Sequence, residues 1–193
     1  MVTTEPRHVM TESAQNAFKR LLRDVVAPEL RRQGFTGSGS LYLLPDAASW
    51  AQVGFQKSTS STADVVKFTI NLKVTDKKYW DEQRRDHSPL NDTPPPGMDQ
   101  TTWDAERLAR SAYPTRPAAN TFGDGQVERI GRLIPGIEAD HWWSLTVDDA
   151  ERVVEDARRT LLTYGVPWLR RALHVSDGNQ RKTRPGKGGA SER

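Results

Sequence analysis

Residues 65–74 read VVKFTINLKV and restrict the possible folds of the chain more than any other segment. Two sets of side chains alternate along it: Val66, Phe68, Ile70, Leu72 and Val74 in the first, and Lys67, Thr69, Asn71 and Lys73 in the second. Successive side chains of a strand point to opposite faces of its sheet, so the pattern predicts a strand with one face on a core. We expect the apolar set to face that core and the polar set to face water.

The elements around this strand do not alternate between strand and helix as a parallel α/β fold requires. Apolar spacing predicts a first helix from residue 14, capped by Thr11 or Ser13, that kinks or restarts at Pro28 and ends near residue 33 before Gly34. The other predicted strands are residues 41–44, residues 50–57 and parts of QVERIGRLI and DHWWSLT. The last two predicted helices run from Thr146 to Gly165 and from Pro167 onward. We therefore predict an α+β fold in which an antiparallel sheet of about five strands packs on the N- and C-terminal helices.

Residues 75–125 break this periodicity. They begin with the charged stretch DKKYWDEQRRD and contain three consecutive prolines, and only a short helix from Thr101 or Thr102 is predicted within them. We expect a surface excursion, and the sequence leaves open whether it is a functional lid or an insertion.

A single α+β domain is expected over residues 11–175, between a flexible N-terminus at residues 1–10 and a disordered basic tail at residues 176–193. The domain includes a mobile proline-rich loop near residues 86–100. From Val175 onward the chain holds five basic and two acidic residues, which equals its whole net charge of +3. The rest of the chain is therefore neutral, so any weak contact with nucleic acid is expected from the tail.

Composition limits the compartment and the chemistry of the protein. The chain contains no cysteine, which excludes disulfides, thiolate metal sites and cysteine nucleophiles. It also lacks the long apolar run of a membrane helix and the apolar stretch of a secretory signal. We expect a soluble cytoplasmic protein without a membrane partner, and the oligomeric state stays open.

No motif in the sequence identifies a catalytic centre. The four histidines, His8, His87, His141 and His174, are too far apart to form a short metal-binding motif. Asp140 precedes His141, but neighbouring side chains of a strand point to opposite faces and cannot pair. The sequence therefore predicts no catalytic residue, no metal ligand and no cofactor, and His141 is expected at the edge of the core.

Several short motifs resemble those of a known family. They are LRRQGFTGSGSLYL, Trp50, VGFQKSTSS, KFTINLKV and HWWSL. Together they resemble the bacterial family called domain of unknown function 4304, in which a helix ends in a Gly-Phe pair and strands of Gln-Lys-Ser and Phe-x-Ile-Asn-Leu type follow. Gly34 with Phe35, residues 56–58 and residues 68–72 match these elements. The resemblance, strongest over residues 30–74, implies a compact α+β domain and no catalytic role.

The polar side of the predicted hairpin is the candidate binding surface. Its residues are Gln56, Lys57, Lys67, Asn71 and Lys73. Their amide and ammonium groups offer hydrogen bonds to a partner, so we expect a non-catalytic recognition or accessory module that binds another protein. Two alternatives stay open: a hydrolase or nuclease whose site assembles only in the fold, and a weak nucleic-acid binder that uses the basic tail.

Overall fold

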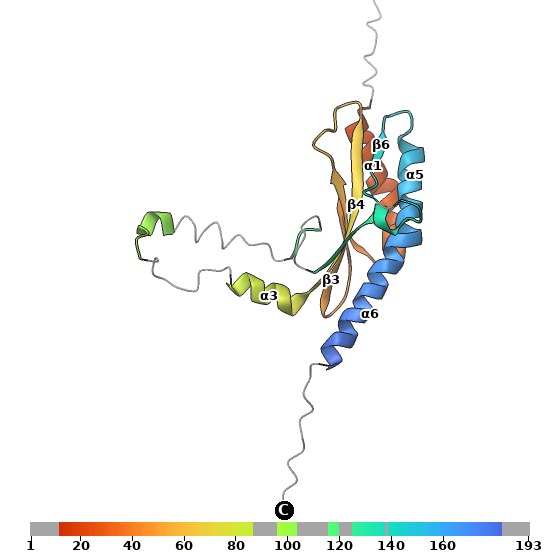
Figure 1. Cartoon of the computed structure of the whole chain (residues 1–193). Coiled ribbons are helices and arrows are strands. Elements are labelled where there is room, and N and C mark those ends of the chain that lie inside the picture. The colour runs from red at the N-terminus through yellow and green to blue at the C-terminus, as the bar shows by residue number, and fades with distance from the viewer. Residues whose placement is uncertain (1–11, 87–95, 104–115, 120–124, 138, 183–193) are drawn as a thin grey trace, which may run out of the picture.

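The computed structural model describes residues 12–86, 96–103, 116–119, 125–137 and 139–182. Figure 1 shows the helices from the two ends of the chain on one side of an antiparallel sheet, and helix α3 (Lys77–Asp86) on the other side. The predicted α+β class is therefore confirmed. Within the described residues, no helix is long and apolar enough to cross a membrane.

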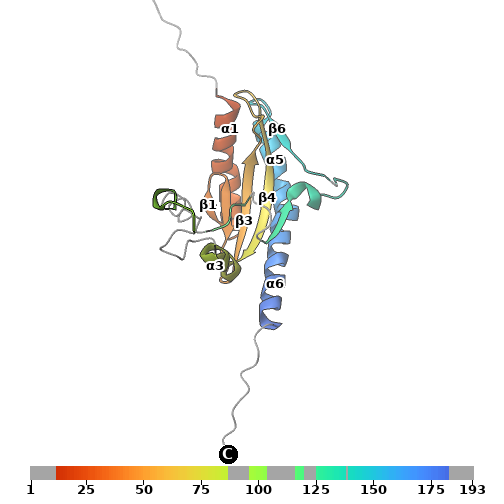
Figure 2. The ribbon, with the colours of Figure 1, turned by 60° about the vertical axis from the view of Figure 1, so that its left-hand side comes forward.

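The sheet has six strands, and every pair of neighbouring strands is antiparallel. The strands are β1 (Thr36–Ser38), β2 (Leu41–Leu44), β3 (Ser49–Lys57), β4 (Val66–Asp76), β5 (Gln126–Arg129) and β6 (Trp143–Leu145). Their order is β1-β2-β3-β4-β5, and β6 pairs with the first part of β4. The hairpin β3–β4 forms the middle of the sheet, as Figure 2 shows, and its two strands are paired from Ser49 with Asp76 to Lys57 with Phe68.

The N-terminal helical segment is continuous. It consists of α1 (Ala14–Leu21), the π-helical turn η1 (Leu22–Val26) and α2 (Ala27–Arg32). Ser13 caps its start by accepting a hydrogen bond from the backbone N–H of Asn16 at 3.3 Å. Pro28 lies in the first turn of α2 and has no backbone N–H to donate. The π-helical turn η1 directly before α2 accommodates this missing hydrogen bond. Gly34 follows the helix with a φ of +90°, so the predicted cap at Ser13 and stop at Gly34 are confirmed, whereas the helix runs through Pro28 without a restart.

The C-terminal helical segment is also continuous, which differs from the prediction. It consists of α5 (Ala150–Thr160), the π-helical turn η3 (Leu161–Gly165) and α6 (Val166–Lys182). Gly165 was expected to end a helix, but a Cβ there would lie 2.7 Å from Leu161 Cδ1 and 3.0 Å from Ile130 Cδ1. This glycine instead lets the helix pack closely against Ile130 and Leu72, and the helix continues through it. Residues 176–182, predicted to be disordered, are therefore helical, and residues 183–193 lie outside the described part.

The start of α5 and the end of β5 differ from the predicted boundaries. Asp149, not Thr146, precedes the first turn of α5, and its Oδ1 accepts a hydrogen bond from the backbone N–H of Thr146 at 2.7 Å. The segment QVERIGRLI is a strand only to Arg129, after which η2 (Ile130–Leu133) forms a 3-10 turn.

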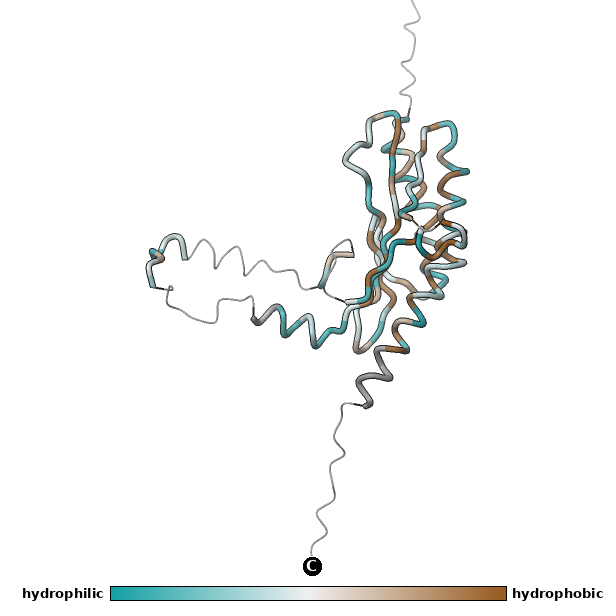
Figure 3. Tube along the Cα trace, in the orientation of Figure 1, coloured by the Kyte–Doolittle hydropathy of each residue, from teal (hydrophilic) through white to brown (hydrophobic). Residues whose placement is uncertain are grey.

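The core lies between the helices and one face of the sheet. Phe68 is fully buried at its centre, with ring centroids 4.8 Å from Phe18 of α1 and 5.5 Å from Trp143 of β6. The other apolar side chains of β4 are buried with it: Val66, Ile70, Leu72 and Val74. Figure 3 shows apolar residues concentrated where helices and sheet meet, whereas α3 is mostly hydrophilic. The predicted inward face of this strand is thus confirmed.

Candidate binding site on the polar face of the sheet

The face of the sheet that points away from the core helices carries polar side chains. The pairing of β3 with β4 places Gln52 opposite Lys73, Gly54 opposite Asn71, and Gln56 opposite Thr69. These polar side chains were expected to face water, and for β4 this expectation is wrong beyond Lys67. Four of its side chains are at most 1% exposed: Thr69, Asn71, Lys73 and Thr75. The polar face is therefore an interior surface over most of its length.

Helix α3 supplies one part of the cover. Asp76, the last residue of β4, starts the helix by accepting a hydrogen bond from the backbone N–H of Tyr79 at 2.8 Å. Lys77 Nζ lies 4.6 Å from the ring centroid of Trp50, and the buried Trp80 ring has its centroid 5.9 Å from Lys73 Nζ. The segment predicted to be a surface excursion thus begins with a helix that turns back over the sheet. The short helix predicted from Thr101 or Thr102 is helical at residues 100–103, and its remainder lies outside the described residues.

Residues 117–119 supply the other part of the cover. Gln52 Nε2 donates a hydrogen bond to the carbonyl oxygen of Pro117 at 2.9 Å, and Lys73 Nζ donates one to the carbonyl oxygen of Ala118 at 3.3 Å. Ala119 sits over Gly54 so closely that a Cβ on Gly54 would lie 2.5 Å from the Cβ of Ala119. The absent side chain at position 54 is what allows this contact.

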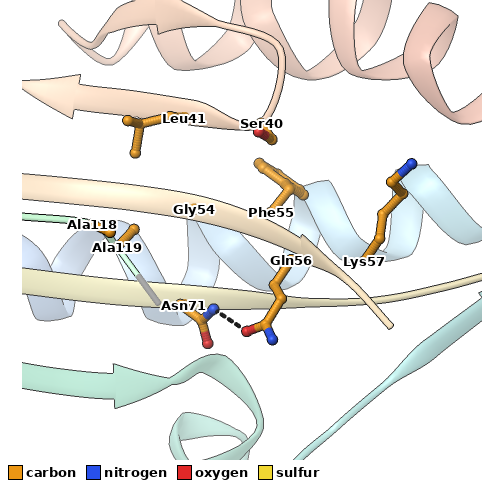
Figure 4. A pocket seen from close by; sticks show the side chains of 9 residues that line it. All are labelled: Ser40, Leu41, Gly54, Phe55, Gln56, Lys57, Asn71, Ala118 and Ala119. Carbon is orange, nitrogen blue, oxygen red and sulfur yellow. Dashed lines mark hydrogen bonds between the residues drawn. The ribbon is translucent and has the colours of Figure 1, made fainter. Parts of the chain in front are cut away.

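A pocket of about 440 Å³ opens beside this contact. Its lining comes from β2 and the turn before it, from β3, from β4 and from the cover: Ser40, Leu41, Gly54, Phe55, Gln56, Lys57, Asn71, Ala118 and Ala119 (Figure 4). Most of this lining is apolar or small. The amide groups of Gln56 and Asn71 are its main polar feature.

The two amide groups bind each other and leave atoms unused. Asn71 Nδ2 donates a hydrogen bond to Gln56 Oε1 at 2.8 Å. Asn71 Oδ1 is buried and accepts no hydrogen bond from the described residues. Gln56 is only half-buried, and it accepts the Asn71 hydrogen bond through Oε1, which leaves its Nε2 group for other contacts. Buried polar groups in folded proteins are nearly always satisfied, so the unpartnered Asn71 Oδ1 is an unusual feature of this face, which it shares with Gln52 Oε1. Because Asn71 is buried, the half-buried Gln56 amide is the polar group that a ligand in the pocket can reach.

The structure separates the five predicted site residues. Gln56 and Asn71 come together in the pocket, and Lys57 lies at its rim, where its Nζ donates to Gln15 Oε1 at 2.9 Å. Lys73 is buried under the cover, and Lys67 is exposed opposite Ser144 of β6, outside the pocket lining. Sequence reasoning missed the contributions of Ser40, Gly54 and the cover. A glycine inside a strand signals a close approach of another backbone, and that signal was present at Gly54.

Asp140 and His141 lie on a different part of the molecule. Asp140 forms an ion pair with Arg129, whose guanidinium carbon lies 5.8 Å from the ring centroid of Trp142. The half-buried His141 contacts Trp143 edge to face, with centroids 4.4 Å apart, at the edge of the core as predicted. In the described part of the chain, no group of three or more His, Cys, Asp or Glu side chains is placed to bind a metal ion.

One carboxylate near these rings has a shifted pKa. Trp143 Nε1 donates a hydrogen bond to Asp156 Oδ2 at 2.9 Å, and this bond lowers the pKa of Asp156 below its ordinary value, with a smaller contribution from Arg159. The bond ties α5 to β6 and so helps to fix the edge of the sheet.

Comparison with known proteins places the chain in a family. The model of the domain of unknown function DUF4304 matches residues 26–171, a range that contains the whole sheet and every residue of the pocket. No curated protein and no solved structure matches the chain. Because the matched range covers most of the sequence, the chain belongs to the DUF4304 family.

Proposed function

We propose that the protein is a non-catalytic recognition module that binds a segment of a partner protein in the pocket beside Gly54. The observation that carries the proposal is the pocket itself, in which apolar walls surround the half-buried amide group of Gln56. Binding pockets typically combine apolar walls with a few fixed polar groups and enclose roughly 300–1,000 Å³, and this pocket has both properties.

The chemistry of the lining favours recognition over hydrolysis. None of the nine lining residues is a histidine, an aspartate or a glutamate, so the pocket offers hydrogen bonds and van der Waals contacts rather than a general acid or base. Ser40 is exposed in the turn before β2, and among the described residues no base accepts a hydrogen bond from its hydroxyl group. The lining also contains one cation, Lys57, which is fewer than a nucleic-acid groove requires.

The test begins with a selection of binding peptides. A library of short random peptides is panned against the immobilised full chain, and the selected peptides are titrated against two variants. Ser40→Trp places an indole at the pocket from an exposed position, and Ser38→Trp adds the same group in β1, outside the lining. We expect Ser40→Trp to weaken binding by more than about tenfold, a loss of about 1.4 kcal/mol, and Ser38→Trp to leave it unchanged.

If selected peptides bind the Ser40→Trp variant as tightly as the unmodified protein, or if no peptide is selected, the pocket is not a site for a partner segment. Thermal unfolding of both variants provides the control, because exposed substitutions usually change stability by about 0.5 kcal/mol or less.

A further inference from the structure

We infer that the partner segment continues from the pocket onto an exposed part of the same sheet face, where Lys67 binds a carboxylate and Trp142 packs against an apolar side chain. The inference rests on the proposed function and adds the chemistry of the segment that is bound. Five side chains form this part of the face, which is called the Trp142 surface below: Gln56, Lys67, Arg129, Trp142 and Ser144.

The pairing of β4 with β6 determines which side chains near β6 reach this face. Phe68 is paired with Trp143, and their stacked rings lie in the core with centroids 5.5 Å apart. Neighbouring side chains of an extended chain point to opposite faces, so Trp142 and Ser144 point away from the core. Ser144 is paired with Lys67, which also points away from the core.

Three long side chains close over the middle of this face. Arg129 of β5 is paired with Asn71, and its guanidinium carbon lies 5.8 Å from the ring centroid of Trp142. On the other side of β4, Gln56 is paired with Thr69 and accepts the hydrogen bond from Asn71. Thr69 and Asn71 are at most 1% exposed, so a partner contacts their longer neighbours and not these two residues.

The Trp142 surface lies outside the cover. Helix α3 follows the last residue of β4, whereas β6 pairs with its first residues, so the two are at opposite ends of the strand (Figure 1). Lys67 and Ser144 are exposed, and Trp142 is 36% exposed. Tryptophan is among the residue types that contribute most to binding when a partner removes them from water, so Trp142 is the apolar anchor of this surface.

The charges on this surface fit a partner with one carboxylate. Arg129 forms an ion pair with Asp140, whereas Lys67 forms no ion pair with any residue that the structure describes, Asp64 in the preceding loop included. The ammonium group of Lys67 is therefore available to a carboxylate of the partner. A nucleic-acid strand carries one phosphate per nucleotide and needs a row of cations, which these two residues do not supply.

The positions of Lys67 and Trp142 set the spacing of the two partner residues. Trp142 precedes Ser144 by two residues, so it is a diagonal neighbour of Lys67, and such side chains begin about 7–8 Å apart. Alternate side chains of an extended segment lie on one side, about 6.6 Å apart. The partner therefore carries an aspartate or glutamate two residues from an apolar residue. Gln56 lines the pocket and borders the Trp142 surface, so one segment reaches both.

The test uses the peptides that are selected by panning the random library on the immobilised full chain. We expect the selected sequences to share an acidic residue two positions from an apolar residue. Lys67→Glu is expected to weaken their binding about fivefold, and less at high salt, because the ion pair is exposed and screened. Trp142→Ala is expected to weaken their binding about tenfold, because it removes the apolar anchor.

Two controls carry the same kinds of substitution elsewhere. Lys19→Glu changes an exposed lysine of α1, on the opposite side of the sheet, and Tyr79→Ala removes an exposed aromatic ring from α3. Both variants should bind the peptides as the unmodified chain does. A lysine in place of the acidic residue of the peptide should restore binding to the Lys67→Glu variant.

A measurement on the unmodified chain does not depend on the folding of a variant. The selected peptides should shift the NMR signal of the Trp142 Nε1–H group in a saturable way, because the bound apolar side chain lies against the indole ring.

Three outcomes overturn the inference: no shared acidic and apolar pair in the selected sequences, unchanged affinity for the Lys67→Glu and Trp142→Ala variants, or no shift of the Trp142 signal. If one of them occurs while the peptides still lose binding to the Ser40→Trp variant, the proposed function stands and only the Trp142 surface is wrong. If Ser40→Trp has no effect on the peptides, the proposed function fails and the inference fails with it.

Discussion

Alanine at position 54 probes the contact on which the shape of the pocket depends. A Cβ added to Gly54 would lie 2.5 Å from the Cβ of Ala119, well inside the usual contact distance of about 3.5–4.0 Å. Forcing extra atoms into a packed site costs about 1–3 kcal/mol, and removing a glycine from a strand regains about 0.5–1 kcal/mol. We expect Gly54→Ala to lower the free energy of unfolding by about 1–2 kcal/mol.

The second-site change Ala119→Gly is expected to relieve this loss. Ala119→Gly alone removes a buried methyl group and costs about 1 kcal/mol. In the double variant the methyl group is on β3 instead of the cover, so the clash disappears. The two changes should therefore be non-additive, with a favourable coupling of about 1–2 kcal/mol.

Urea unfolding followed by tryptophan fluorescence measures all members of this double-mutant cycle. The matched control is Gly54→Ala with Ala118→Gly. Ala118 is the neighbouring residue of the cover, but none of the three atoms nearest to the added Cβ belongs to it. We expect the control pair to be additive within about 0.5 kcal/mol. Additive energies for the pair at 54 and 119 would refute the close packing of residues 117–119 on the sheet.

Three further results are expected. Phe68→Ala should destabilise the protein by about 3–5 kcal/mol in urea unfolding, because it leaves a cavity between Phe18 and Trp143, and an unchanged midpoint would contradict the core assignment. The pKa of Asp156 is lowered in the folded state, so its contribution to stability is present above the unfolded pKa of about 3.9 and is lost as the pH falls through the folded pKa. Asp156→Asn should therefore make the stability depend less on pH in this acid range, and a pH profile identical to that of the unmodified protein would contradict this role of Asp156. Acetylation of Lys73, followed by mass spectrometry, should be more than about tenfold slower than that of Lys67 on the same strand, and equal rates would mean that the cover is open.

The core of the fold is predictable because its signals are local. The alternation over residues 65–74 identifies β4 and its inward face, and Ser13 and Gly34 identify the two ends of the first helical segment. Gly165 could not be interpreted correctly from its neighbours. Its role is a close contact with Ile130, which lies far away in the sequence, and the same residue type also ends helices.

The candidate site is only half predictable, because its cover is distant in sequence. Gln56 and Asn71 follow from the strand pattern, and the register of β3 and β4 brings them together. The expectation that Lys73 faces water fails because the carbonyl group of Ala118 accepts its hydrogen bond. Every residue has such a carbonyl, so the sequence of the cover carries no signal that a polar strand face lies beneath it.

The position of a bound peptide is the most direct test of the proposed recognition site. Intermolecular NOEs between methyl-labelled protein and the tightest selected peptide report which methyl groups the peptide contacts. We expect NOEs from Leu41 and Ala119, which line the pocket. NOEs confined to Val147 or Val175, whose side chains are exposed elsewhere on the surface, would contradict the account.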